Sequence, residues 1–290
     1  MVNVGFEMHG LMMNTPLLIT SLIQFAAQYH GDTSIVTRST EGSIRRSSYR
    51  EVFGRAQRLA NALLDYGIKP GDRIATVAWN TDRHIELYYA ISGIGAICHT
   101  VNLRLADEEL IYILNHAEDR LVFFDTDMAE AMARVQPHTK SVERFVAMSD
   151  AAHQPDVAPT GTVDYESFIA AASDHHDWAE FDENTAASMC YTSGTTGDPK
   201  GVLYSHRATV LHAMASCYAS TLNLRTEDVI LPVVPMFHVN AWGIPYSCPI
   251  AGTPLVMPGP KLDGQSLFEL MDAEGVTMAL GVPTVWMNLD

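Results

Sequence analysis

Apolar and polar positions follow two different periods along the chain, and the change of period predicts an alternation of helices and strands. Apolar residues every three or four positions indicate a helix, and short unbroken apolar runs indicate a buried strand. From residue 73 to residue 124, and again after residue 186, the two patterns follow one another in turn. Strand, helix and strand at this spacing are typical of parallel βαβ units. We therefore expect an α/β fold whose parallel sheets are covered by helices on both faces.

Local signals place the ends of several of these elements. Thr15 and Pro16 have the residue types of a helix N-cap and a first helical position, and Ser48 with Glu51 forms a capping box before a helix that stops at Gly67. The expected helices span residues 16–30, 49–66, 84–91, 107–116, 206–220 and 265–274. The expected strands span residues 35–37, 44–47, 73–79, 96–101, 121–124, 187–191, 229–231, 254–257 and 277–280.

Two stretches follow neither period, and we interpret them as surface loops. Residues 149–162 contain Pro155, Pro159 and Gly161, and residues 173–184 are polar and acidic. The second stretch carries adjacent histidines at positions 175 and 176. Paired histidines in an acidic loop are more often solvated side chains than metal ligands, so we assign them no role.

Composition changes this picture mainly through charge. Of the 290 residues, 47% are apolar and 18% are charged, which argues against a disordered or fibrous chain. A net charge of −16 repels nucleic-acid phosphates and anionic lipid headgroups, so we expect no nucleic-acid binding and at most transient membrane contact. The four cysteines show no C-x-x-C pair and no zinc-type spacing, and we expect them to be reduced in a cytoplasmic protein.

One glycine-rich segment, residues 191–201, carries the clearest chemistry. Directly after an apolar strand it holds three glycines, four hydroxyl side chains and Lys200. Glycines let backbone N–H groups approach a ligand, hydroxyls add donors and the lysine adds positive charge, a combination that suits a polyphosphate. The alternative is an ordinary turn without a ligand. The segment is not a P-loop of the G-x-x-x-x-G-K-[ST] type, because Pro199 precedes Lys200 and Gly201 follows it.

Beyond this segment the pattern indicates a second strand before any helix. Residues 202–204 read as a short strand, and Ser205 is the first N-cap signal. The segment therefore joins strand to strand, and we expect a lid over a phosphate chain rather than a cradle at a helix N-terminus. The apolar stripe expected on the following helix consists of Val210, Leu211, Met214, Cys217 and Tyr218.

These motifs carry a resemblance to a known family. Residues 191–202 resemble the phosphate-binding signature of the adenylate-forming superfamily, which includes acyl-CoA synthetases, luciferases and the adenylation domains of peptide synthetases. Residues 231–246 resemble, more narrowly, the medium- and long-chain fatty acyl-CoA synthetases. Further matching segments lie within residues 78–88, 99–105, 112–119, 204–207 and 281–286.

The resemblance implies a two-step ligase built on stacked βαβ subdomains. A fatty carboxylate attacks the α-phosphate of ATP, pyrophosphate leaves with magnesium, and coenzyme A then displaces AMP to give the thioester. Donors and a cation are needed where negative charge develops on the departing pyrophosphate. By resemblance, Lys200 has a catalytic role and Thr192 holds magnesium. The implied phosphate-binding residues are Thr192, Ser193, Gly194, Thr195, Thr196, Gly197 and Lys200.

The acyl site is implied by a second group of residues. A histidine or tryptophan in an apolar run is by default a core residue. By resemblance, however, His238 lines the acyl and adenylate site with a catalytic role, and Trp242 gates the fatty-acid tunnel. Gly281, Val282 and Pro283 are implied to flank the acyl pocket. The same turn fits a plain junction between a strand and a helix that begins at Pro283.

The resemblance stops where the sequence stops. Residue 290 falls inside an expected helix, and the family's later adenine- and ribose-binding motifs, hinge and small C-terminal domain have no counterpart here. We therefore expect residues 1–290 to form an incomplete N-terminal adenylate-forming domain, with approximate subdomains 1–180 and 181–290, that cannot complete adenylation. One alternative is a non-catalytic product that retains binding or dimerisation surfaces, with a homodimer through the N-terminal region. The other is a ligase for a short sulfur-containing or aryl carboxylate.

Overall fold

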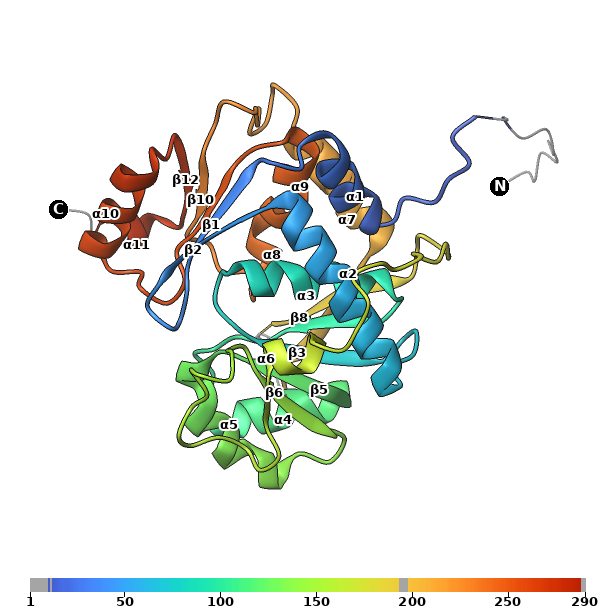
Figure 1. Cartoon of the computed structure of the whole chain (residues 1–290), viewed down its shortest axis with the longest axis vertical. Coiled ribbons are helices and arrows are strands. Elements are labelled where there is room, and N and C mark those ends of the chain that lie inside the picture. The colour runs from blue at the N-terminus through green and yellow to red at the C-terminus, as the bar shows by residue number, and fades with distance from the viewer. Residues whose placement is uncertain (1–9, 11, 193–197, 288–290) are drawn as a thin grey trace.

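Two β-sheets form the framework of the computed structural model, which describes residue 10, residues 12–192 and residues 198–287 (Figure 1). The strands of the larger sheet lie in the order β7 (Val163–Asp164), β6 (Arg144–Ala147), β5 (Asp119–Phe124), β3 (Arg73–Val77), β4 (Ile97–Thr100), β8 (Ala186–Thr192) and β9 (Lys200–Ser205). The smaller sheet has the order β12 (Met278–Leu280), β10 (Ile230–Pro232), β11 (Leu255–Met257), β1 (Ser34–Arg38) and β2 (Ile44–Ser48). The pairs β1–β2 and β8–β9 are antiparallel and the remaining pairs are parallel, so the α/β prediction is confirmed, with an antiparallel strand at one edge of each sheet.

Helices lie between the two sheets and on their outer faces (Figure 1). The helices between the sheets are α1 (Thr20–Tyr29), α2 (Tyr49–Tyr66), α3 (Asp82–Gly93), α7 (His206–Ser216), α8 (Val239–Trp242) and α9 (Ile244–Ala251). Those on the larger sheet's other face are α4 (Asp107–Ala117) and α5 (Ala129–Val135). The remaining helices are α6 (Tyr165–Ile169), α10 (Gly264–Glu274), α11 (Pro283–Trp286) and the 3₁₀ turns η1 (Thr126–Met128) and η2 (Gln136–His138).

The unbroken apolar run of β5 shows why the larger sheet is covered on both sides. Leu121 and Phe123 belong to the core shared with α1, α2 and α3, whereas Val122 and Phe124 pack with α4 and α5. Side chains alternate between the faces of a strand, so a continuous apolar sequence requires cover on both faces. The prediction of helices on both faces of this sheet is confirmed.

Helix α3 lies at the centre of the molecule, and each of its twelve residues is buried. Its histidine, His84, has both ring nitrogens engaged, with the Trp79 carbonyl at 2.9 Å and the Thr76 hydroxyl at 2.9 Å. Burial lowers the pKa of His84 to about 4, so the ring is neutral. His84 is a core histidine with satisfied hydrogen bonds, and it is not available for catalysis.

Some predicted helix ends are confirmed and others are wrong. The Ser48 hydroxyl accepts the N–H of Glu51, and α2 is followed by Gly67 at φ +99°. By contrast, Thr15 is not an N-cap, because α1 begins at Thr20 and follows Ile19, which makes no side-chain cap. The N–H of Leu17 instead donates to the Glu183 carboxylate at 2.7 Å, so a distant acidic side chain engages this backbone before the helix begins.

The stripe predicted for α7 is also wrong in part. Ser205 does cap the helix, accepting the N–H of Ala208 at 3.1 Å. However, the helix ends at Ser216 rather than residue 220, and its buried apolar residues are Val210 and Ala213. Three residues of the predicted stripe, Leu211, Met214 and Tyr218, are exposed.

Each sheet combines strands from distant parts of the chain. Strands β1 and β2, from residues 34–48, share a sheet with strands from residues 230–280, and β8 and β9 share a sheet with strands from residues 73–164. A subdomain boundary near residue 180 stays a prediction, and it does not coincide with the division between sheets. Among the residues that the structure describes, none of the helices is both long and apolar enough to cross a membrane.

Candidate active site

The glycine-rich segment connects β8 to β9, as the sequence predicts. Thr192 ends β8 and Lys200 begins β9, and the two residues are partners across the antiparallel pair. Both side chains are exposed. The predicted phosphate-binding residues Ser193, Gly194, Thr195, Thr196 and Gly197 lie outside the described residues. The structure therefore positions the two ends of the segment next to each other.

Tyr191 holds the first of these ends in place. Its hydroxyl lies 2.6 Å from Nδ1 of His116, and its ring packs against the His99 ring with centroids 5.1 Å apart. A Cβ on Gly201 would come within 3.3 Å of the same ring, so glycine leaves room for it. His99 is in turn bonded to the Asp119 carboxylate at 2.7 Å, and both residues are fully buried. Burial raises the pKa of Asp119, and His99 opposes part of that shift.

A cavity of about 220 Å³ opens beside Thr192. It lies at the carboxyl ends of the parallel strands β4 and β8, the usual edge for ligand binding in α/β sheets. His238 lines this cavity together with Thr192, so the structure brings these two predicted site residues together. The residues that line the cavity are Thr100, Asn102, Leu105, Glu109, Ile113, Tyr191, Thr192, Pro199 and His238.

The residues after His238 form a left-handed turn. Val239, Asn240, Ala241 and Trp242 have φ between 48° and 54°, and Gly243 follows at 77°. The left-handed conformation costs roughly 1–2 kcal/mol for each ordinary L-residue, so the surrounding structure must hold the turn in place.

The side chain of Asn240 anchors this turn to the larger sheet and to α3. Its amide nitrogen donates to the Ser188 hydroxyl on β8 at 2.9 Å, and its oxygen accepts from the Tyr88 hydroxyl at 3.4 Å. The N–H of Ala241 also donates to the Pro235 carbonyl at 3.2 Å. Backbone strain of this kind is concentrated at functional sites, which supports a role for residues 238–243.

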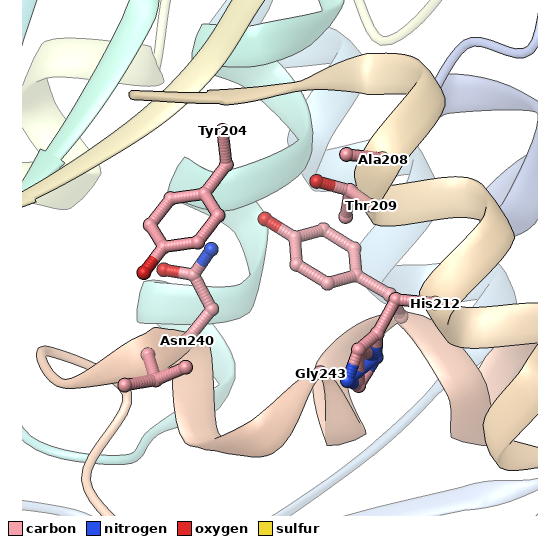
Figure 2. A pocket seen from close by; sticks show the side chains of 8 residues that line it. Tyr204, Ala208, Thr209, His212, Asn240 and Gly243 are labelled. Carbon is pink, nitrogen blue, oxygen red and sulfur yellow. The ribbon is translucent and has the colours of Figure 1, made fainter. Parts of the chain in front are cut away.

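The same turn forms one wall of a second cavity, also about 220 Å³ (Figure 2). Figure 2 shows Tyr204 from β9 facing Asn240 from the turn, with the His212 ring directed at Gly243. A Cβ on Gly243 would lie 3.0 Å from Nδ1 of His212. The residues that line this cavity are Tyr204, Ala208, Thr209, His212, Val239, Asn240, Gly243 and Tyr246. Residues 238–243 therefore contribute to the walls of both the cavity beside Thr192 and a second, mostly apolar one.

The other predicted acyl-site residues line neither cavity. Trp242 is 39% exposed, and its role as a gate stays a prediction. Gly281 and Val282 connect β12 to α11, which begins at Pro283. The indole N–H of Trp286 donates to the Gly281 carbonyl at 3.1 Å, which closes the turn. These contacts describe a junction between strand and helix, and they leave an acyl-binding role of residues 281–283 as a prediction.

The sequence predicts no role for several residues that line the site. Asn102 and Glu109 line the first cavity, and Tyr246 lines the second. Asn240 was not singled out either, although asparagine is enriched in the left-handed conformation. That preference and the family resemblance of residues 231–246 are the sequence signals that point to this segment.

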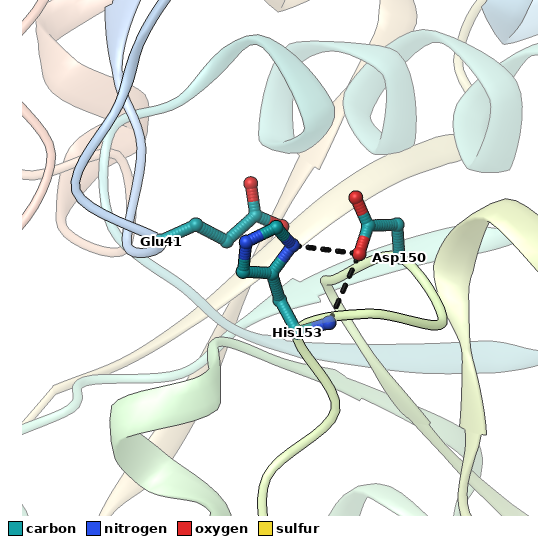
Figure 3. A group of neighbouring side chains, drawn as sticks. All are labelled: Glu41, Asp150 and His153. Atoms are coloured by element: carbon teal, nitrogen blue, oxygen red, sulfur yellow. Dashed lines mark hydrogen bonds and ion pairs between the residues drawn. The ribbon is translucent and has the colours of Figure 1, made fainter.

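A third group of side chains, Glu41, Asp150 and His153, has ligand atoms within 4.8 Å of one another (Figure 3). Its members are already engaged, because Glu41 accepts from the Arg83 guanidinium at 2.8 Å and His153 Nδ1 lies 2.7 Å from the Asp150 carboxylate. The positive charge of Arg83 opposes a cation here. We assign this group no metal.

Comparison with known proteins decides the family. A family model described as "AMP-binding enzyme" matches residues 23–289, which is nearly the whole chain. The chain belongs to the AMP-binding enzyme family. The expected membership of the adenylate-forming enzymes is thereby confirmed.

Relatives and solved structures of this family narrow the similarity to CoA ligases. The chain is 50% identical to a medium-chain-fatty-acid–CoA ligase from Ectopseudomonas oleovorans and 49% identical to a 3-methylmercaptopropionyl-CoA ligase from Ruegeria lacuscaerulensis, each over 97% of the chain and 52% of the relative. A structure of a putative long-chain-fatty-acid CoA ligase from Rhodopseudomonas palustris superposes with a TM-score of 0.78 at 28% identity, covering 95% of this chain and 66% of that one. The chain spans about half the length of the curated relatives it matches.

Proposed function

We propose that this chain belongs to an ATP-dependent fatty acyl-CoA ligase. The observation that carries the proposal is the position of residues 238–243, which line both the cavity at the base of the glycine-rich segment and a second, mostly apolar cavity. A ligase that joins a carboxylate to a phosphate requires this arrangement, because the carboxylate must meet the phosphate while its apolar chain stays buried. The identity of 49–50% to acyl-CoA ligases supports the same conclusion.

In the first proposed step the carboxylate oxygen attacks the α-phosphate of ATP, and the bond to pyrophosphate breaks. Lys200 is placed beside Thr192, where its ammonium group can neutralise charge on the phosphates. The imidazole of His238, on the wall of the same cavity, is positioned to orient the carboxylate. Preorganised charge and orientation of this kind lower the barrier without a covalent intermediate on the protein.

Magnesium would neutralise charge on the triphosphate when bound. The residues fit such an ion, because Mg²⁺ is usually held by substrate phosphates, waters and only one or two protein oxygens. The cavity wall holds several oxygen groups, among them the Thr192 hydroxyl and the Glu109 carboxylate. We propose Thr192 as the protein ligand, in agreement with the sequence prediction.

In the second proposed step the sulfur of coenzyme A attacks the acyl carbonyl carbon and AMP leaves with the electron pair of the broken C–O bond. The apolar chain of the acid occupies the second cavity throughout. Trp242 lies in the sequence between Asn240 and Gly243, which line this cavity, and its side chain is partly exposed. We propose that this side chain gates the cavity.

A second candidate substrate is a short sulfur-containing acid. Support for this candidate comes from the similarity to the 3-methylmercaptopropionyl-CoA ligase, whose identity to this chain is 49%, against 50% for the medium-chain fatty-acid ligase. The two relatives have different printed substrates at almost the same identity, so identity alone does not choose between them.

The experiment is a steady-state assay of thioester formation with ATP, magnesium, coenzyme A and straight-chain acids from butanoate to palmitate. It is performed on the 290-residue chain and on the complete gene product if the gene encodes further residues. We expect turnover by the complete product and a loss of at least about 100-fold in the Lys200→Ala variant. No thioester with any acid would overturn the proposal, and turnover by the 290-residue chain alone would refute the expectation that it cannot complete adenylation.

Two further proposals concern where the protein acts and whether it forms a dimer. We propose that the protein acts in the cytoplasm, which is consistent with four free cysteines. A homodimer through the N-terminal region also stays a prediction. Sedimentation analysis with and without residues 1–19 tests it, because loss of that region should shift a dimer to a monomer.

A further inference from the structure

The segment that connects β10 to the left-handed turn is buried but belongs to no sheet and no helix. Strand β10 ends at Pro232, and residues 233–238 follow without regular secondary structure. Backbone N–H and C=O groups that are buried outside helices and strands need other hydrogen-bond partners. His238, which we propose orients the carboxylate, is the last residue of this segment. The side chains that hold the segment therefore help to decide where His238 lies.

One side chain, that of Asn80, supplies three of these partners. Its amide N–H groups donate to the carbonyls of Pro232 at 2.8 Å and Val234 at 2.9 Å. Its amide oxygen accepts the N–H of Met236 at 2.7 Å. A primary amide has two N–H donors, so both donors of Asn80 are engaged with this one segment. Asn80 is 4% exposed and lines neither cavity, which gives it no direct contact with a ligand there.

The hydroxyl of Tyr88 holds the same backbone from the other side. It donates to the carbonyl of Met236, whose N–H is already bonded to Asn80. Met236 is fully buried, and side chains rather than a neighbouring strand engage both of its backbone polar groups. The N–H of His238 then donates to the Pro235 carbonyl at 3.1 Å, which closes a turn. His238 thus follows two residues after a backbone position that is fixed on both sides.

Asn80 and Tyr88 are themselves held by the centre of the molecule. Asn80 lies between β3 and α3, and the next residue, Thr81, caps α3 by accepting the N–H of His84. Tyr88 belongs to α3, which is buried along its whole length. The Asn80 carbonyl also accepts the N–H of Gly259, beyond the end of β11, at 3.2 Å. Asn80 therefore joins the carboxyl end of β3 in the larger sheet to two segments that follow strands of the smaller sheet.

We propose that Asn80, assisted by Tyr88, is a positioning residue for His238. This inference rests on the proposed ligase function, in which His238 orients the carboxylate for its attack on ATP. Loss of the two amide donors leaves two buried carbonyls without partners, so residues 232–236 shift to recover them. A displacement of about 1 Å at a reacting group can lower a rate about 100-fold even when the changed residue is remote from the chemistry.

The first test replaces an amide by a carboxyl group of nearly the same shape at two matched asparagines. Asn80→Asp removes both N–H donors and keeps an acceptor oxygen. Asn61→Asp is the control, because the Asn61 amide also donates to two carbonyls, those of Ser173 at 2.9 Å and His175 at 2.8 Å. Asn61 lies on α2 and lines neither cavity, so its bonds hold a segment that is separate from the site.

A second pair of variants removes only a hydroxyl, and it decides the question by the same criteria if Asn80→Asp does not fold. Tyr88→Phe keeps the ring and loses the donor to the Met236 carbonyl. Tyr89→Phe is its control, because the Tyr89 hydroxyl donates to the Pro245 carbonyl on α9 at 2.7 Å. Both tyrosines are fully buried, so the two changes differ mainly in which backbone segment is released.

Steady-state kinetics of the complete gene product give kcat and separate KM values for the acid and for ATP. We expect kcat/KM for the acid to fall by roughly 10- to 100-fold in Asn80→Asp and roughly 3- to 10-fold in Tyr88→Phe, with a raised KM for the acid. The KM for ATP should stay within about 2-fold of the wild type, because Asn80 makes no hydrogen bond to β8 or β9, which carry Thr192 and Lys200. A merely structural role would reduce the folded fraction, which lowers kcat and changes neither KM. The controls should retain kcat/KM for the acid within about 2-fold.

Two results would overturn the inference: an unchanged KM for the acid in both Asn80→Asp and Tyr88→Phe, or an equal fall of kcat/KM in the controls. If the wild type forms no acyl-AMP with any acid, the proposed function fails. Amide hydrogen exchange of residues 236–243 then decides by itself whether Asn80 holds His238 in place. Faster exchange of this peptide in Asn80→Asp than in Asn61→Asp supports the inference, and equal exchange overturns it.

Discussion

The left-handed turn leads to a quantitative prediction about stability, because the same substitution should cost much less at one of two matched positions than at the other. Val239 lies in the turn at φ 48° and is 41% exposed, and Val202 lies in β9 and is 39% exposed. Replacement by glycine removes a similar amount of buried side chain at each site. Only at Val239 does glycine also relieve an unfavourable backbone conformation.

The magnitudes follow from three contributions. At either position the partly buried valine loses roughly 1–2 kcal/mol of apolar burial, since full burial is worth about 1.5–3 kcal/mol. Glycine loses a further 0.5–1 kcal/mol or so through unfolded-chain entropy. At Val239 the relief of the left-handed conformation returns about 1–2 kcal/mol. We therefore expect Val202→Gly to destabilise by about 2 kcal/mol, and Val239→Gly to stay within about 1 kcal/mol of the wild type.

The assay is urea unfolding followed by circular dichroism, with the free energy of unfolding extrapolated to water. The decisive quantity is the difference between the two variants, because the two valines lose nearly the same buried surface. A difference of about 1–2 kcal/mol in favour of Val239→Gly is expected. If Val239→Gly destabilises as much as Val202→Gly, the turn carries no backbone strain and the reasoning fails.

Three further predictions concern buried polar groups and close contacts. Burial raises the pKa of Asp125 to about 8, so the folded state keeps a proton that the unfolded state releases above about pH 4. The free energy of unfolding should therefore fall as the pH rises between these values. Urea unfolding at pH 5 and pH 8 should show a smaller fall in Asp125→Asn than in the wild type. Gly243→Ala should destabilise the fold by at least about 1–2 kcal/mol, because Gly243 has φ 77° and the new Cβ would contact His212. A melting temperature equal to that of the wild type would contradict this. Tyr191→Phe loses the bond to His116 and should raise the KM for ATP several-fold with little change in melting temperature, whereas an unchanged KM would show that this contact does not position the segment.

Much of the fold could be predicted because its signals are local. The run of β5 and the cap at Ser48 identify a strand and a helix from neighbouring residues alone. Helix α9 gave no such signal, because it carries Pro245 and Pro249 and is apolar on most sides, so periodicity does not separate it from a strand. The stripe of α7 failed because partners from other parts of the fold, rather than its own pattern, decide which face is buried.

The candidate site was predicted less completely than the fold. Thr192, Lys200 and His238 are predicted from composition and resemblance, and the structure brings Thr192 and His238 to one cavity. The contact between Tyr191 and His116 joins residues 75 positions apart, and no local pattern reports it. The buried Tyr246 hydroxyl has no hydrogen-bond partner among the described residues, which is likewise a property of packing that no local pattern reports.

The activity that we propose is activation of a carboxylate as an acyl-adenylate and transfer of the acyl group to coenzyme A. The most direct measurement is mass spectrometry of a single-turnover reaction of the complete gene product with ATP, magnesium and an acid, first without and then with coenzyme A. We expect acyl-AMP and pyrophosphate in the first stage, their absence in Lys200→Ala, and conversion of acyl-AMP to acyl-CoA and AMP in the second. Formation of ADP and phosphate, or of acyl-CoA without a detectable acyl-AMP stage, would contradict it.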